Sequence, residues 1–326
     1  SITTSGAAIT GNDYNIDASG HMVNISAGNN GIMGGNKTIT VGKLNIEAKS
    51  SGRTEGISVG GQGETDAENR LTINGDTNIN VKGKGYTLGV YTAGAGELII
   101  NGNVTMKGED GSWGVDVNGG SVPGYYNISG LYAGSNYSIQ KGSHIEVNGA
   151  VDLAVNGTGV LANGGKATID LNGGGTILTN KENSGHYALI SQSGHINMNV
   201  KKDEHGNVVS AGDNKVNVYG NLGVMNGSVH PNEPDKTTSI NLGLSTSDSE
   251  WVGIIANNFT EKQIADGWKG EVNLYLSNGA SWTNEAYGTA YSKFAGSTVE
   301  NFVGGASADK AGNIFQKDSN NLTFNN

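Results

Sequence analysis

The sequence predicts an all-β fold, a single right-handed parallel β-helix in which short strands and turns coil into a stacked rod. Three observations predict it: short runs of alternating apolar and polar residues, glycine turns between these runs, and repetition of the whole unit. The pattern is clearest from Leu71 to Gly120, where LTINGDTNINVKGKGYTLGVYTAG is followed by ELIINGNVTMKGEDGSWGVDVNGG. Units of this size built only from strands and turns are typical of solenoids.

The most regular feature of the repeat is a small residue followed by an aliphatic one, recurring roughly every 30 residues. We expect the aliphatic side chains to stack above one another in the bore, because a buried column needs similar volumes at the inter-strand spacing of about 4.8 Å. They are Ile32, Ile57, Val90, Val115, Leu131, Val160, Leu189, Val224 and Ile254. The repeats predict about a dozen coils and a rod about 55 to 60 Å long.

The composition favours one β-helical domain over residues 1–326. The chain contains 54 Gly but only 3 Pro, and 15% of its residues are charged. Gly and Asn tolerate the positive φ of tight turns, which a coil with three turns needs repeatedly. There is no cysteine, so backbone pairing and a long core must hold the fold without disulfides. The net charge of −10 argues against nucleic acid or an anionic membrane as partner.

Polar insertions are expected to leave the rod between coils. Lys201–Lys215 and Ser228–Thr238 are polar, and the second contains two of the three prolines. Such segments are typical of surface loops.

One short helix is expected near residues 260–267. Thr260 as N-cap and Gln263 three residues later match a capping box, and Gly267 is placed to end the helix. We expect Ile264 and Trp268 to pack this helix on the rod.

Aromatic residues between Gly83 and Tyr137 form the first candidate binding surface. Tyr91 and Tyr132 directly follow bore residues, so they should face outward, because successive side chains of a strand point to opposite faces. Outward tyrosines stack on sugar rings or bind protein partners, although they can also simply cover neighbouring strands. The candidate ligand-binding residues are Tyr86, Tyr91, Trp113, Asp116, Tyr125, Tyr126 and Tyr132.

Aliphatic residues occupy the same outward position farther along the chain. They are Leu161, Ile190, Met225 and Ile255. If exposed, such a row would mark a surface for self-association. The alternative is a corner at which both neighbouring residues are buried.

The residues do not form a pattern typical of an active site. Asp116, Asp152 and Asp170 fall in successive units but at different offsets from the bore residue, so they need not converge as in polysaccharide lyases or hydrolases. The histidines are scattered singly and lack the spacing of a zinc site. We therefore expect no metal, no cofactor and no enzymatic activity; a polysaccharide-degrading β-helix enzyme is the alternative.

Residues 271–326 resemble the end of autotransporter passenger domains, the secreted part of bacterial type V secretion proteins. The resemblance is carried by the strand at Leu274–Leu276, the turn Asn278-Gly279-Ala280-Ser281-Trp282, the strand from Ser297 to Phe302, and Leu322-Thr323-Phe324. The remaining coils resemble the family in composition: they are rich in Asn, Gly and Thr and low in charge.

The resemblance implies an adhesin on or released from the outer membrane of a Gram-negative bacterium. Its implied partners are glycans or proteins of a host or neighbouring cell, and homotypic contacts in aggregation or biofilm formation. In that family a translocator barrel follows the passenger and provides the membrane attachment, and no such segment lies within residues 1–326.

Overall fold

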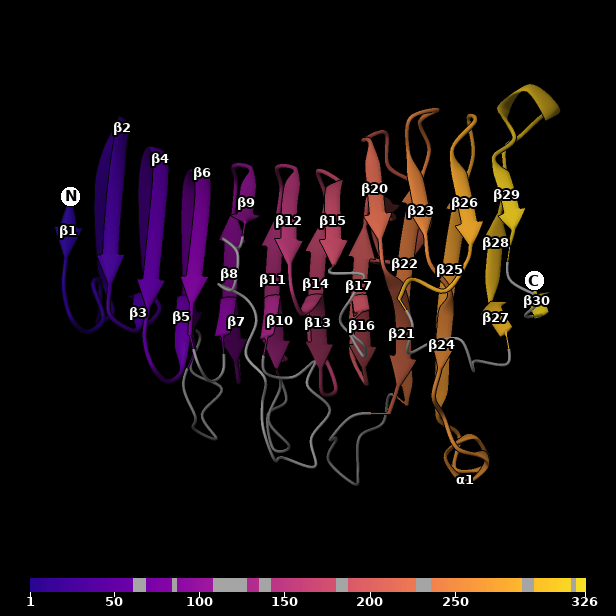
Figure 1. Cartoon of the computed structure of the whole chain (residues 1–326), viewed down its shortest axis with the longest axis horizontal. Helices are drawn as coiled ribbons and strands as arrows, with labels where there is room; N and C mark the ends of the chain where they lie inside the picture. Colours follow the sequence, from indigo (N-terminus) through magenta and orange to yellow (C-terminus); the bar gives the residue numbers. More distant parts are fainter. Residues whose placement is uncertain are drawn as a thin grey trace.

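The computed structural model describes residues 1–60, 69–83, 87–107, 128–134, 142–179, 187–226, 236–288, 296–317 and 321–326. These residues form a parallel β-helix, as predicted, with strands stacked in chain order along one row (Figure 1). Within them, no helix is long and apolar enough to cross a membrane.

Three columns of parallel strands form the walls. The first column stacks β2 (Tyr14–Ala27), β4 (Lys37–Lys49), β6 (Asn69–Lys82), β8 (Gly96–Ile100), β11 (His144–Val147), β14 (Thr168–Leu171), β17 (His195–Met198), β22 (Thr237–Leu244), β25 (Lys269–Leu276) and β28 (Asn301–Val303). These ten strands span about 43 Å at 4.8 Å per step, so the described part of the rod is shorter than the 55 to 60 Å expected.

The second column begins with β1 (Ile2–Thr3) on the C-terminal half of β2, because β2, β4 and β6 are long enough to serve both walls. It continues through β9 (Val104–Lys107), β12 (Val151–Val155), β15 (Gly175–Thr179), β20 (Val216–Tyr219), β23 (Glu250–Val252), β26 (Ser281–Asn284) and β29 (Asn313–Gln316).

The third column is a sheet of β3 (Asn30–Met33), β5 (Thr54–Val59), β7 (Thr87–Ala93), β10 (Ile128–Gly134), β13 (Thr158–Asn163), β16 (Tyr187–Gln192), β21 (Asn221–Met225) and β24 (Ile255–Asn257). Its pairings confirm the bore residues from Ile32 to Leu189, which stack in the order Ile32, Ile57, Val90, Leu131, Val160 and Leu189 and are all fully buried. A last parallel pair, β27 (Gly296–Val299) with β30 (Asn321–Phe324), forms a separate two-stranded sheet, and Ser297 Oγ on β27 accepts a 3.0 Å hydrogen bond from the N–H of Ile255 on β24.

Two parts of the predicted bore column are wrong. Val90 pairs directly with Leu131, so the column has no rung between these two residues, and Val115 lies outside the described residues. Past Leu189 the column continues through Leu222 and Ile255, where Val224 and Ile254 were expected. The cause is a register shift between β16 and β21, next to Leu189.

The small residue before each bore residue is required by lack of space. A Cβ atom on Gly56 would lie 2.5 Å from the carbonyl oxygen of Gly89, and one on Gly89 would lie 2.7 Å from that of Gly130. Gly31, Gly130 and Gly159 meet the next coil in the same way. Ala188 takes this place in the following coil, and the register shift occurs there.

One corner of the helix is built from four consecutive Asn-Gly turns, at Asn74, Asn101, Asn148 and Asn172. Each of the last three asparagines donates from Nδ2 to the Oδ1 of the asparagine one coil before it, at 2.7 to 2.9 Å, and Asn74 donates to Thr40 Oγ1 at 3.2 Å. The following glycines stack so closely that a Cβ atom on Gly102 would lie 2.3 Å from the carbonyl carbon of Gly75. Both residues of the Asn-Gly turn are therefore needed: the asparagine for its hydrogen bonds and the glycine for the close stacking.

Near the C-terminal end, the bore holds two fully buried tryptophans. Trp251 and Trp282 pair across β23 and β26 with ring centroids 4.5 Å apart and planes 5° from parallel. Each indole Nε1 donates to a backbone carbonyl at 3.0 Å, on Gly220 and Gly253 respectively. Both rings are thus packed and hydrogen-bonded.

The polar insertion at Lys201–Lys215 contains an antiparallel hairpin, β18 (Val200–Lys202) with β19 (Val208–Ala211), which leaves the rod between β17 and β20. Most of Ser228–Thr238 lies outside the described residues.

The predicted helix is present as α1 (Glu261–Ala265), and both hydrogen bonds of the Thr260–Gln263 capping box form. The expectation that Ile264 packs on the rod is wrong, because this side chain is 59% exposed. Trp268 is half-buried. The turn is too short to lay a side face on the rod and projects from it after β24 (Figure 1).

Candidate functional site

Tyr91 and Tyr132 form an aromatic pair on the outer face of the third column, as the alternation of side chains predicted. The two residues are register partners on β7 and β10, each half-buried. Their ring centroids lie 5.2 Å apart at an interplanar angle of 62°, an edge-to-face contact.

Polar side chains flank both rings. The Arg53 guanidinium lies 5.1 Å from the centroid of the Tyr91 ring and pairs with Glu55, which accepts a 2.8 Å hydrogen bond from Asn30 Nδ2. On the other side, Asn163 Nδ2 donates to the Tyr132 hydroxyl at 3.0 Å. We call Arg53, Tyr91, Tyr132 and Asn163 the tyrosine platform.

Burial raises the pKa of Tyr91, although the nearby Arg53 charge acts in the opposite direction. The phenol therefore stays protonated at neutral pH and remains able to donate a hydrogen bond.

The other predicted ligand-binding residues lie outside the described residues. They are Tyr86, Trp113, Asp116, Tyr125 and Tyr126.

The outward aliphatic residues do not form an exposed row. Leu161 and Ile190 are fully buried, Met225 is 7% exposed and Ile255 is 1% exposed. The first three pack in a small apolar cluster that also contains Tyr187, outside the main core, and Ile255 has entered the bore. The corner interpretation therefore describes them better than a self-association surface.

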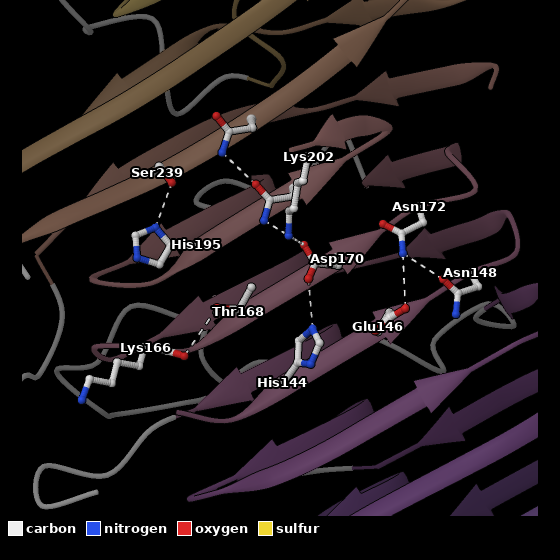
Figure 2. A network of polar contacts seen from close by, with 12 residues as sticks. His144, Glu146, Asn148, Lys166, Thr168, Asp170, Asn172, His195, Lys202 and Ser239 are labelled. Atoms are coloured by element: carbon white, nitrogen blue, oxygen red, sulfur yellow. Dashed lines mark hydrogen bonds and ion pairs between the residues drawn. The ribbon is translucent and has the colours of Figure 1, made fainter. Parts of the chain in front are cut away.

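A polar network that the sequence analysis missed covers the outer face of the first column (Figure 2). At its centre, Asp170 on β14 contacts the Nε2 of His144 on β11 at 3.0 Å and the Nζ of Lys202 on β18 at 2.6 Å. Asn197 on β17 donates to the same carboxylate at 2.8 Å. The hairpin is thereby tied to the wall by an ion pair between a partly exposed lysine and a nearly buried carboxylate.

A ladder of amides runs from Asp170 toward the C-terminal end of the rod. Asn241 donates to Asn197 at 2.7 Å, Asn273 to Asn241 at 2.8 Å, and Asn301 to Asn273 at 2.8 Å. The carboxylate of Asp170 can only accept, so Asn197 must turn its Nδ2 toward it and its Oδ1 toward Asn241. The same requirement passes along the ladder and fixes the direction of every amide.

These contacts change how Asp170 and His144 titrate. Burial alone would raise the pKa of Asp170, but hydrogen bonds from His144, Lys202 and Asn197 lower it to about 2. Burial alone would lower the pKa of His144, yet its hydrogen bond to Asp170 and the surrounding carboxylates raise it. Asp170 is therefore ionised at any physiological pH.

A groove of about 690 Å³ lies over this polar face, beside the hairpin. Its floor includes Asn197, Ser239, Asn241 and Asn273, which are 7 to 9% exposed. His195 Nδ1 contacts the Ser239 hydroxyl at 2.9 Å at one side of the groove (Figure 2).

Two other sequence features lie apart from this network. Asp152 lies on the second column, paired with Lys107 at 3.0 Å, so it does not converge with Asp170. The stretch Gly56-Ile57-Ser58-Val59-Gly60 has the spacing of a nucleophile elbow, but Ser58 lies inside β5 and not at a strand-to-helix turn.

The signal for the polar face was present in the sequence. HIEVN, TIDLN, HINMN and SINLG, which begin at His144, Thr168, His195 and Ser239, occupy consecutive coils in register. Their third residues are Glu, Asp, Asn and Asn, which is the ladder position. Aligning the repeats on these strands would have placed the ladder residues at one position and predicted that they are neighbours.

No protein-family model, curated protein or solved structure matches the chain. Within the described residues, no group of three or more His, Asp or Glu side chains is arranged to hold a metal ion.

Proposed function

We propose that this chain is an adhesive binding domain of the autotransporter passenger type, and that the tyrosine platform contacts its ligand, a glycan or a protein on another cell. The observation that carries the proposal is the Tyr91–Tyr132 pair, held on an outer wall of the rod.

The platform offers the contacts that such ligands use. Each ring presents apolar area beside a hydroxyl group, and little conformational entropy is lost on binding because Tyr91 and Tyr132 are already packed together. Arg53 and Asn163 add hydrogen-bond donors at the two edges of the pair. A sugar ring over a tyrosine face would meet polar groups at its rim.

The rod supports adhesion through its shape. A stiff stack of coils holds surface sites at fixed intervals, so weak contacts to a repetitive surface add in free energy. Display at the surface of a Gram-negative bacterium is part of the proposal and is supported by the resemblance of residues 271–326 to passenger domains.

The polar network favours binding over acid–base catalysis. A glycosidase of the usual kind needs one carboxylic acid that can donate a proton. Asp170 has a pKa of about 2 and accepts hydrogen bonds from three side chains, so it is a poor proton donor.

The experiment is a glycan and host-protein array with the intact chain, followed by titration of the best ligand into single variants. Tyr91→Ala and Tyr132→Ala are each expected to weaken binding tenfold or more, while Tyr91→Phe retains most of it because the ring remains. Tyr14→Ala is the matched control, because Tyr14 is half-buried on the first column, away from the platform. Unchanged binding in both alanine variants, with unchanged circular dichroism, would refute the assignment.

A further inference from the structure

We propose that the groove beside the β18–β19 hairpin is a second, separate binding site, and that it takes a neutral, hydroxyl-rich glycan chain lying along the rod. The inference does not depend on the tyrosine platform, which lies on the third column, whereas the groove lies on the first.

The hairpin is a fixed wall of this groove. Asn199, which is 1% exposed and has a φ of 52°, donates from Nδ2 to the carbonyls of Asn214 and Gly243 at 2.9 and 3.0 Å. Its Oδ1 accepts from the backbone N–H of Asn214 at 3.1 Å, which closes the base of the insertion. Lys202 then ties β18 to Asp170 on the rod. The groove is therefore present before any ligand binds, and little ordering entropy is lost on binding.

The floor repeats one functional group at the spacing of the coils. Within the ladder, Asn241 and Asn273 each donate once and accept once, but a primary amide has two N–H groups and two lone pairs. One donor and one acceptor per amide remain for a ligand, repeated about every 4.8 Å. Adjacent hydroxyl groups on a sugar, each both donor and acceptor, match such amides.

The charges of the site favour a neutral ligand. Lys202 is the cation of the groove, and it is already paired with Asp170, so it offers little net attraction to an anionic chain. Glu271 also lines the groove, so the lining has no excess of positive charge that would attract carboxylated or phosphorylated chains. Apolar pockets for peptide side chains are scarce in the floor, which is made mainly of Asn, Ser, Thr and His residues. An extended peptide would therefore bury little apolar side-chain area in this groove and bind weakly.

The volume agrees with an oligosaccharide. About 690 Å³ lies within the range of pockets that hold small ligands, and the groove runs past several consecutive coils of the first column. A chain of a few sugar units could contact more than one rung of the ladder.

The test is calorimetric and NMR titration of the intact chain with neutral hexasaccharides of glucose and of N-acetylglucosamine. The parallel probes are a galacturonate hexasaccharide and a neutral extended peptide. We expect a neutral hexasaccharide to bind and to shift the side-chain amide signals of Asn241 and Asn273. Asn273→Leu is expected to reduce its affinity at least tenfold.

Asn148→Leu is the matched control. It also removes one amide from a row of hydrogen-bonded asparagines, but this row lies at the Asn-Gly corner, outside the groove. A second variant replaces Lys202–Val208 with a two-residue Asn-Gly turn and removes the wall while keeping the floor; it should also lose binding. Tyr91→Ala should bind the hexasaccharide normally, which separates this site from the platform. The proposal is overturned if only the acidic or peptide probe binds, if no neutral hexasaccharide binds, or if Asn273→Leu and the hairpin variant both bind like the unaltered chain.

Discussion

At the scale of single residues, the glycines that precede the bore residues leave no room for a side chain. In Gly89, a Cβ atom would lie 2.5 Å from Met106 Sδ inside the bore and 2.7 Å from the carbonyl oxygen of Gly130 in the next coil. Because the second contact is to backbone, it cannot be relieved by a side-chain rotation.

Gly89→Ala is therefore expected to lower the free energy of unfolding by about 1 to 3 kcal/mol, the usual cost of overpacking. Urea denaturation followed by circular dichroism measures it. Gly52→Ala is the control, since its Cβ atom would meet only Ser50 Oγ, at 3.9 Å. Equal stability of the two variants would contradict the steric argument.

Asp170 gives the fold a defined dependence on pH. Its folded pKa of about 2 is below the unfolded value of about 3.9, so its contribution is complete above about pH 5 and is lost as the pH falls through 2. The full difference corresponds to about 2 to 3 kcal/mol, of which about 2 kcal/mol is lost between pH 5 and pH 2.

The stability gap between the unaltered chain and Asp170→Asn should therefore shrink by about 2 kcal/mol between pH 5 and pH 2. Urea unfolding at a series of pH values measures this gap. Asp152→Asn, which alters an exposed pair with Lys107, should give a nearly constant gap. A constant gap for Asp170→Asn as well would mean that the network does not hold this carboxylate ionised.

At the scale of elements, the stacked tryptophans join the last coils. Trp251 and Trp282 fill the bore across β23 and β26, and both indoles are fully buried. Trp282→Ala should lower the free energy of unfolding by about 3 to 5 kcal/mol, because it leaves a large cavity and frees the Gly253 carbonyl. Trp282→Phe should cost clearly less, since most of the ring volume remains.

Thermal unfolding followed by tryptophan fluorescence compares the two variants. Trp268→Ala serves as a control, because Trp268 is only half-buried beside α1. If Trp282→Ala and Trp268→Ala shift the midpoint equally, the stacked pair is not a major source of stability.

Most wall strands could be predicted from the sequence, because alternation and Asn-Gly turns are local signals. The bore from Ile32 to Leu189 follows from the same periodicity. The shift to Leu222 could not be predicted, since Val224 is equally apolar and the irregularity beside Ala188 is seen only in the pairing of β16 with β21. The α1 capping box is local and was predicted, whereas the exposure of Ile264 depends on where the rod lies beneath the helix.

The candidate sites also differ in whether their signal is local in the sequence or depends on contacts between distant segments. Tyr91 and Tyr132 are outward by strand alternation, which any single repeat reveals. The contact of Asp170 with Lys202 joins residues 32 positions apart across an insertion, so it depends on the path of the hairpin. The burial of Leu161 and Ile190 depends on packing outside the column, which a single repeat does not contain.

At the scale of the whole molecule, each coil contacts mainly its neighbours, so one coil should be removable. Deleting residues 144–167 takes out β11, β12 and β13 and joins Ser143 to Thr168. The registers then allow β14 to stack on β8, with Ile169 above Leu98 where Ile145 had been.

We expect the shortened chain to fold, with a β-rich circular dichroism spectrum and a denaturant m-value reduced in proportion to the lost surface. Deleting residues 150–161, half a coil, puts strands of different walls together and is the control. If both deletions aggregate or unfold alike, the coils are not interchangeable units.

The direction of the amide ladder has a consequence far from the residue that sets it. With an asparagine in place of Asp170, the row could turn over as a whole and keep its amide–amide hydrogen bonds, and only the loss of the contact with the Lys202 ammonium would oppose the reversed row. A single negative charge thus removes this two-fold ambiguity, and a sugar bound several coils away would meet one arrangement of donors and acceptors where it would otherwise meet a mixture of two.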